Sequence, residues 1–530
     1  MARPSLPVSD PGPAHRPPLR PPLRPAFRRV AALLLTGCLA TQPLVLAAQQ
    51  PLSASDWLSG SVRGPQRESS AWRPGDGSRR PDPKGQPSRR AVAESGAVGP
   101  VQVTRLDQTN PDHTGTQSAS RAGLPTDLWQ GSDPSVLAAQ VLSTPARLPA
   151  MQGLMRRILT AQLTPPQWTP DRAPDPSAEA APKTAGSIAG QLFLARVDRL
   201  LDMGALQPAQ TLLAAAGPGE PEIFRRMFDI ALLEGDESRA CAIMDNTPGI
   251  APSFTARIFC LAQTGDWAAA AVSLHGAEAL GLIDERRAIL LTHFLDDAFV
   301  DGAEILEPAD PMTPIEFRIH EAIGQPLPTT PLPVAFAQSD LRLNSGFKAR
   351  VEAAERLVRA GALSHQQLRA IYAEQRPAAS GGVWERAGVM RTLEAALLSG
   401  DLRQALPRAF DEFRRADMAN LLAGMVAQDL PDSEDPDTAR ITALLQAWQG
   451  MRPLPDAVEP IETLPPPDVP TTAKGEALLA AMTDIDAALE GDLARAARGV
   501  AQMRALGLTQ DADLAAAQIA LLSELAGEAG

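Results

Sequence analysis

The chain has few aromatic side chains and few of the residues that usually carry chemistry. Aromatics make up 4% of its 530 residues, with a single tyrosine, six histidines and three cysteines. It contains no HExxH zinc motif, no Gly-x-Ser-x-Gly nucleophile elbow and no Walker phosphate loop. Carboxylates are plentiful, but on expected helix faces they indicate a solvated surface. We therefore expect no enzyme activity, no metal site and no cofactor.

Charge is divided unevenly along the chain. Residues 1–50 hold six arginines and one aspartate, whereas residues 122–530 hold 33 basic and 54 acidic side chains. An acidic body repels phosphate backbones, which argues against nucleic-acid binding.

The N-terminal 48 residues have the pattern of a secretory signal peptide. Arginines up to Arg29 precede an apolar stretch from Val30 to Ala48, and this stretch ends in small residues. Residues 1–48 therefore predict export to the periplasm of a Gram-negative-type cell. The stretch is interrupted by Gly37 and Pro43, which argues against a permanent membrane span.

Two cleavage sites compete in this signal. Cleavage after Val45-Leu46-Ala47 would release a soluble chain that begins near Ala48. Leu35-Thr36-Gly37-Cys38 resembles a bacterial lipobox, in which Cys38 would be lipidated. We favour the soluble form because the residues after Cys38 stay apolar, and an uncleaved anchor is the third alternative.

The next part of the chain reads as a tether followed by a first pair of helices. Residues 49–124 are rich in Pro, Gly, Ser and Arg and lack apolar periodicity, which predicts a disordered spacer. An alternative role is contact with an anionic envelope polymer through paired arginines. Apolar spacing predicts a helical hairpin over 125–165 with Trp129 in its core, followed by a linker over 166–185.

A Gly-Asp turn with an alanine five residues after the glycine then recurs. Glycine can end a helix with positive φ, aspartate can cap the next helix, and alanine allows two helices to cross closely. The copies are Gly204 with Ala209, Gly235-Asp236 with Ala240, Gly265-Asp266 with Ala270, Gly400-Asp401 with Ala405, and Gly491-Asp492 with Ala496.

This pattern resembles the tetratricopeptide (TPR) repeat family, and Gly265-Asp266-Trp267 with Ala270 is its closest match. Pro221 and Pro252 stand where the family has its helix-ending proline. The first three copies are 31 and 30 residues apart, shorter than the family's period of about 34. The resemblance implies an all-α, TPR-like α-solenoid, in which Trp267 would be a core residue.

Proline-rich stretches divide the helical part into blocks. Whether these blocks stack into one body stays open at this point. The predicted segments are TPR-like helical repeats at 186–300, a connector with a short helix at 301–345, a helical block at 346–450, a linker at 451–472 and one or two C-terminal helix pairs at 473–528.

Two cysteines remain outside the signal region, Cys241 and Cys260. They lie nearly level across an expected antiparallel hairpin, which permits a disulfide in an oxidising periplasm. The alternative, which we favour slightly, is that both are small buried core residues.

One loop, from Arg376 to Trp384, is a candidate binding loop. It contains a glycine pair, and both end residues could engage a ligand. The competing interpretation is a glycine-rich helix connection with Trp384 in the core.

The pattern as a whole predicts a non-enzymatic scaffold that binds protein partners in the cell envelope. The alternative is a peptidoglycan-associated auxiliary protein, similar to the superhelical part of a soluble lytic transglycosylase. Only 58 residues follow Thr472, too few for the catalytic domain of those enzymes. Association with the outer membrane is also compatible with the export signal.

Overall fold

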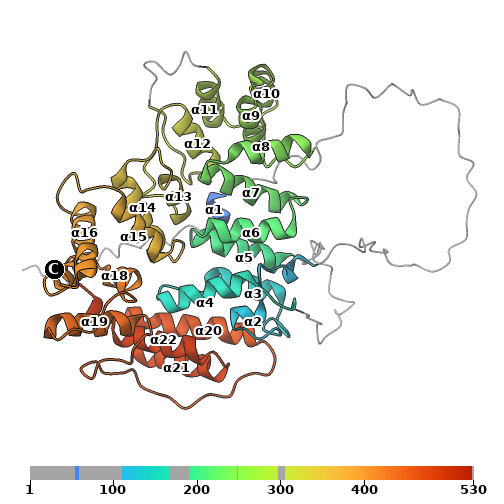
Figure 1. Ribbon diagram of the computed structural model, residues 1–530. Helices are drawn as coiled ribbons and strands as arrows, with labels where there is room; N and C mark the ends of the chain where they lie inside the picture. Colours follow the sequence, from blue (N-terminus) through green and yellow to red (C-terminus); the bar gives the residue numbers. More distant parts are fainter. Residues whose placement is uncertain (1–53, 59–109, 167–189, 248, 297–304, 528–530) are drawn as a thin grey trace, which may run out of the picture. The chain divides into compact units, whose positions relative to one another are not determined.

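A computed structural model describes residues 54–58, 110–166, 190–247, 249–296 and 305–527, and these residues are mostly helical (Figure 1). The strands within these ranges are β1 (Gln117–Ser118) and β2 (Ala161–Gln162), which pair in parallel. None of the described helices is both long enough and apolar enough to cross a bilayer. The predicted signal peptide, Cys38 and nearly all of the linker at 166–185 lie outside these ranges.

The predicted repeat region contains a succession of helices in which each packs on the next. Proline begins α7, and its ring fits the first turn, where the missing N–H has no intrahelical partner. The helices are α5 (Gln191–Asp202), α6 (Leu206–Ala216), α7 (Pro221–Glu234), α8 (Glu237–Asn246), α9 (Phe254–Gln263), α10 (Trp267–Ala279) and α11 (Glu285–Leu295).

The first three Gly turns share one geometry. Asp266 caps α10, because its Oδ1 accepts a hydrogen bond of 3.1 Å from the amide of Ala269, whereas Asp236 makes no such bond to α8. Each glycine has positive φ (73°, 81° and 88°) and each following alanine is buried: Gly204 with Ala209, Gly235 with Ala240, and Gly265 with Ala270.

The two later copies differ from each other. Gly491 has φ of 86° and Ala496 is buried, while Asp492 caps the next helix through a 3.0 Å bond from the amide of Arg495. After Gly400, by contrast, the next helix begins only at Ala405, which is partly exposed, and Asp401 is not its cap. Residues 401–404 form an extra loop there because Leu402 turns inward and is buried.

The described part of the proline-rich connector, residues 305–345, is packed against the first helices rather than extended between blocks. Its predicted short helix is present as α12 (Pro314–Ala322), which packs on α7 and α11. It is followed by η3 (Val334–Phe336) and α13 (Ala337–Asp340). Gln338 donates a 2.8 Å bond to the carbonyl of Gly204, and Ser339 donates a 2.9 Å bond to that of Leu233.

The block at 346–450 has its own hydrophobic core, to which α23 also contributes. Consecutive helices again pack on one another from α14 to α19. The block comprises α14 (Phe347–Arg359), α15 (His365–Glu374), α16 (Val383–Ser399), α17 (Ala405–Arg415), α18 (Ala419–Val426) and α19 (Pro436–Trp448).

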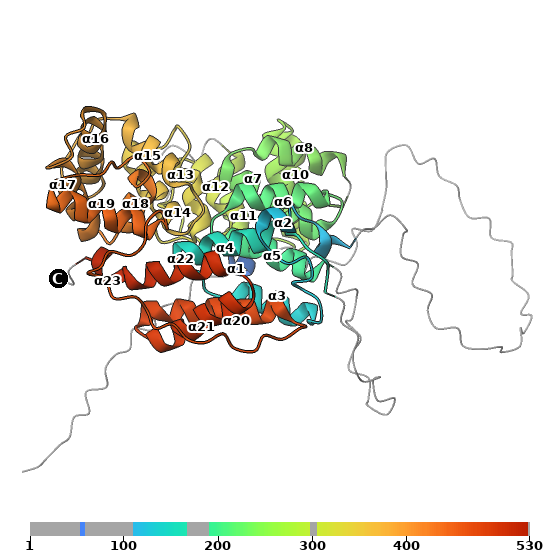
Figure 2. The same cartoon turned by 60° about the horizontal axis from the view of Figure 1, so that its bottom comes forward.

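The C-terminal helices return to the helices at 134–160 (Figures 1 and 2). Among them, α20 (Lys474–Asp486) packs on α3 (Pro134–Ser143), and α22 (Thr509–Ala520) packs on α4 (Pro149–Thr160) and on α19. Arg147, between α3 and α4, binds Asp486 with 2.5 Å between Nε and Oδ2, and the side chain of Gln518 accepts a 3.0 Å bond from the amide of Ala150. The helices are α3 (Pro134–Ser143), α4 (Pro149–Thr160), α20 (Lys474–Asp486), η4 (Ala487–Glu490), α21 (Leu493–Ala505), α22 (Thr509–Ala520) and α23 (Leu522–Leu525).

This return contact settles the question that the sequence left open for residues 473–528. They share one hydrophobic core with residues of α3–α6 and do not form a separate module. Trp129 is fully buried, as expected, but its ring lies against Gly475 of α20. Within the predicted hairpin at 125–165, α3 packs mainly on α5 rather than on α4.

Two segments that composition assigns to the tether belong to the helical body. Residues 110–124 contain η1 (Pro111–His113) and α2 (Ala119–Ala122), and residues 54–58 contain α1 (Ala54–Trp57). The tether predicted over 49–124 is therefore interrupted at 54–58 and ends before 110. The average composition of a stretch does not reveal such segments, because their few apolar side chains are buried by helices that lie far away in the sequence.

The buried guanidinium of Arg196 on α5 holds the segment at 110–124 in place. It donates to the carbonyl oxygens of Leu159 at 2.8 Å and of Thr114 and Ala161 at 2.9 Å. Complete burial lowers the pKa of Arg196 to about 10, and the nearby Asp112 opposes this shift. The carboxylate of Asp112 accepts from the amide of Phe193 at 2.7 Å, so η1 and α5 are tied together from both sides.

Helices α8 and α9 are joined by a disulfide between Cys241 and Cys260, with 1.96 Å between the sulfur atoms and 5.2 Å between the Cα atoms. Both residues are also buried. The structure therefore has the disulfide that the sequence permitted, not the two unbonded core cysteines that we favoured.

The disulfide gives a first prediction. After unfolding in denaturant without reductant, Cys241 and Cys260 should both resist alkylation, because their sulfur atoms are bonded to each other. Mass spectrometry of the alkylated chain reads this directly, with a reduced sample as the control in which both must react. Alkylation of both cysteines in the unreduced sample would exclude the bond.

The contact between Trp129 and Gly475 gives a second prediction. A Cβ at position 475 would lie 2.5 Å from Cε3 of Trp129 and 2.9 Å from the carbonyl oxygen of Leu128. We expect Gly475→Ala to lower the free energy of unfolding by about 1–3 kcal/mol, the usual cost of overpacking, as measured by urea denaturation.

Gly276→Ala is the matched control, because Gly276 lies within α10 and nothing would contact its Cβ within 4 Å. It should raise the free energy of unfolding by roughly 0.5–1 kcal/mol through helix propensity alone. Equal effects of the two substitutions on the free energy of unfolding would show that the space between position 475 and Trp129 can hold a methyl group without cost.

Candidate functional site

Helix α10 carries an exposed apolar surface, which we call the α10 surface. Side-chain exposure is 50% for Trp267, 73% for Val272 and 73% for Leu280. We include in it Leu282 and Ile289, which are exposed in the following loop and in α11. Of the 13 large exposed hydrophobic residues in the described ranges, these five fall within 267–289, so they form a concentration and not the usual scatter of single residues.

The sequence of α10 explains why this surface exists. The helix has apolar residues on all sides, and such a helix is normally buried all round. Here only Ala270, Leu274 and Ala277 are buried, against the neighbouring helices α9 and α11. The opposite face, which includes Val272 and Gly276, is exposed to solvent.

Trp267 is not the core residue that the resemblance to TPR repeats implied. Its ring packs at 6.1 Å from that of Phe294 of α11, which in turn stacks at 5.4 Å on Phe259 of α9. The tryptophan stays half exposed because the next described helix, α12, packs on α7 and α11. An aromatic row thus runs from the interior of α9 to the surface.

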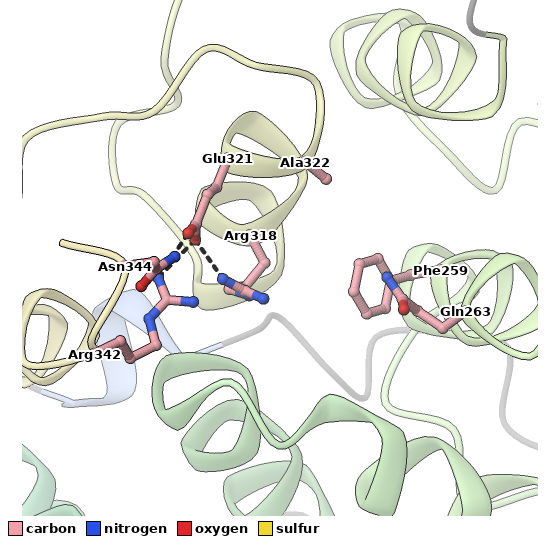
Figure 3. A pocket seen from close by; sticks show the side chains of 7 residues that line it. All are labelled: Phe259, Gln263, Arg318, Glu321, Ala322, Arg342 and Asn344. Atoms are coloured by element: carbon pink, nitrogen blue, oxygen red, sulfur yellow. Dashed lines mark hydrogen bonds and ion pairs between the residues drawn. The ribbon is translucent and has the colours of Figure 1, made fainter.

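A small pocket of about 260 Å³, lined in part by Phe259, lies between α9 and α12 (Figure 3). Its polar wall consists of Arg318 and Glu321 of α12 together with Arg342, whose side chains point toward one another. The pocket is lined by Phe259, Gln263, Arg318, Glu321, Ala322, Arg342 and Asn344.

The charges in this pocket are matched. Glu321 accepts two hydrogen bonds from Nη2 of Arg342, at 2.9 and 2.7 Å, and is also paired with Arg318. Arg318 reaches across to Glu237 of α8 with an N–O distance of 2.8 Å. Burial by itself would raise the pKa of Glu321, but the hydrogen bond from Arg342 and the two guanidinium charges outweigh it and hold this pKa below its usual value.

This arrangement suits structural pairing and contact with a polar ligand better than catalysis. The lining has no cysteine, serine or histidine that could act as nucleophile or base, and both carboxylates in the network are engaged by arginines. In the part of the chain that the structure covers, no group of three or more His, Cys, Asp or Glu side chains is placed to hold a metal ion.

The predicted binding loop, Arg376 to Trp384, lies elsewhere. Trp384 is partly buried and its ring packs 5.4 Å from that of Phe347, while Arg376 is exposed. The loop joins α15 to α16, as in the competing interpretation of a helix connection, and a binding role for its two end residues stays a prediction. Gly381 and Gly382 both have positive φ in this connection.

Sequence reasoning missed a buried network next to this loop. Glu355 accepts two bonds from Arg386, at 2.8 and 2.7 Å, and one of 2.5 Å from the hydroxyl of Tyr372. Burial, followed by the charge of Glu355, raises the pKa of Tyr372 well above its usual value. Because the acid and the guanidinium are fully paired, this network links α14, α15 and α16 and offers no free reactive group.

Comparison with known proteins adds no relative. No family model matches the chain, and neither the curated proteins nor the solved structures yield a match. The functional argument therefore depends on the geometry of the chain itself.

The pocket gives a third prediction. Because Glu321 has a lowered pKa, its stabilising effect is present above the unfolded-state pKa and is lost as pH falls through the lower folded-state pKa. Glu321→Gln should therefore reduce the free energy of unfolding by about 1–2 kcal/mol at pH 7 and by much less near pH 3. Urea denaturation at several pH values measures this.

The exposed Glu459, in the connector before α20, supplies the control for this prediction. Glu459→Gln should change stability by less than about 0.5 kcal/mol at any of these pH values. A Glu321→Gln effect that did not change with pH would show that the arginine pairing of this carboxylate does not stabilise the fold.

Proposed function

We propose that this protein is an exported, non-enzymatic helical-repeat scaffold that binds protein partners in the periplasm or cell envelope. The observation that carries the proposal is the α10 surface: a concentration of exposed apolar side chains on a helix that is apolar all round. Concentrations of exposed apolar side chains commonly mark sites of interaction with other proteins.

The helix architecture supports the proposal in a second way. Consecutive helices from α5 to α11 turn at positive-φ glycines and cross over buried alanines, as in TPR-like repeats. In stacked repeats each unit covers the apolar face of its neighbour, and terminal units need a polar outer face to stay soluble. The outer face of α10 is apolar, so a partner helix could cover it as a further repeat would.

The chemistry of the α10 surface favours protein over cell-wall polymer. Its side chains are Trp267, two leucines, a valine and an isoleucine, and aromatic and aliphatic side chains of this kind fill the centres of protein interfaces. A peptidoglycan strand presents hydroxyl, amide and carboxylate groups, which such a surface cannot satisfy. Peptidoglycan binding is therefore the alternative that the experiment must separate.

The fourth prediction tests this surface. In a crosslinking pull-down from envelope fractions, we expect Val272→Glu to lower recovery of the partner at least tenfold, because a charge would be buried in an apolar contact. Val272 is 73% exposed, so the fold should be unaffected. Quantitative mass spectrometry of the captured proteins reads the result.

Leu398→Glu is the matched control, since Leu398 is 91% exposed on α16, away from the α10 surface. It should leave the recovery unchanged. Equal recovery by Val272→Glu and the unaltered chain would show that the α10 surface is not the binding site. The wall-binding alternative would be supported instead if the protein co-sedimented with purified peptidoglycan and Val272→Glu removed no captured protein from the pull-down.

A further inference from the structure

Ala54, Trp57 and Leu58 of the short described segment 54–58 are buried in the helical body, whereas Asp56 is exposed. Ala54, Trp57 and Leu58 are exposed by 0%, 1% and 3%. They are spaced i, i+3 and i+4 on the short helix α1, which places all three on one side. Anchors with this spacing are typical of a helical peptide held in the groove of another protein.

The site that holds this segment is formed by two parts of the body. Helix α1 packs on α5, and the ring of Trp57 meets that of Phe336 in η3 edge-on, with 5.5 Å between the centroids. Phe336 is fixed from its other side by Phe317 of α12, at 5.4 Å. Figure 1 shows α1 in blue, among the green and yellow helices that belong to much later parts of the chain.

A polar contact adds to these apolar ones at the start of α1. The carboxylate of Asp202, at the end of α5, accepts a hydrogen bond from the amide of Ala54. Burial raises the pKa of Asp202 to about 7, and Arg199 and the Ala54 amide oppose the shift while Asp198 and Asp56 add to it. This carboxylate is thus enclosed when α1 is in place.

We infer that residues 54–58 are a docking motif of the chain itself, which binds against α5 and η3 and ties this segment to the helical body. The stretch 59–109 then joins two attached points and is not a leash between the body and whatever lies N-terminal to it. The inference does not depend on what the α10 surface binds.

The consequence concerns where residues 54–58 are held. A tether that was free from 49 to 124 would let residues 54–58 move far from the body, whereas docking holds them beside α5. A joining stretch of this length gives an effective concentration in the millimolar range, so a contact tight enough to outlast cutting of the stretch would be occupied nearly all of the time in the intact chain.

The experiment cuts the joining stretch. A site-specific protease sequence is placed after Gly85 in the full chain, which carries a C-terminal affinity tag. After cleavage, the immobilised body is washed and the retained N-terminal fragment is measured by mass spectrometry. We expect the fragment to stay bound to the body, and Trp57→Ala to shorten its retention time at least tenfold. Trp72→Ala, in the same fragment, is the matched control and should leave retention unchanged.

Two outcomes would overturn the inference. One is immediate loss of the fragment from the unaltered body, and the other is equal retention with Trp57→Ala. If Trp57→Ala does not fold, a synthetic peptide covering residues 50–62 is added to the cleaved, unaltered protein, where it should speed release at least tenfold relative to a scrambled peptide. Mixing isotope-labelled and unlabelled copies before cleavage tests whether the motif docks on a second copy, and a fragment found on the other copy's body would contradict docking within one chain.

Discussion

The contact between the C-terminal helices and the helices at 134–160 is the constraint on which much of the structure depends. Trp129 fits against α20 only because position 475 has no side chain, and Arg147 binds Asp486 within the same contact. Behind it lies the core that α3–α6 share with α20–α22. If each helix packed only on the next one, the array could stop after any helix. The contact between the first and last helices requires both sets to be present together.

Local features of the fold could be read from the sequence, because they are decided by neighbouring residues. The helices from α5 to α11, the glycine turns at 204, 235 and 265, and the short helix α12 all follow from periodicity, positive-φ glycines and proline positions. The failures have one cause. Burial of Trp57 and the extra loop at Leu402 depend on contacts made by distant residues or on tertiary packing, which leave no periodic signal.

The candidate site shows the same limit in another form. The sequence drew attention to Trp267 because of its place after Gly265-Asp266, but predicted it to be buried. Its exposure depends on where α12 packs, and no nearby residue encodes that. The ion pairs around Glu321 could be suspected from Arg318 at i−3, but Arg342 and Glu237 join them only in three dimensions. The Arg376–Trp384 loop, by contrast, looked unusual in sequence yet connects helices.

The return of the last helices also bears on the order in which the chain can fold. Asp127 and Lys474 are 347 positions apart and form an ion pair at 2.8 Å, next to Trp129. Helices α3 and α4 emerge early during synthesis and can pack on α5, but their faces that contact α20 and α22 stay uncovered until the final residues are available. Contacts of such high sequence separation form slowly, so these faces stay exposed for the whole time of synthesis or translocation. A chain of this design would depend on holding chaperones until its C-terminus arrives.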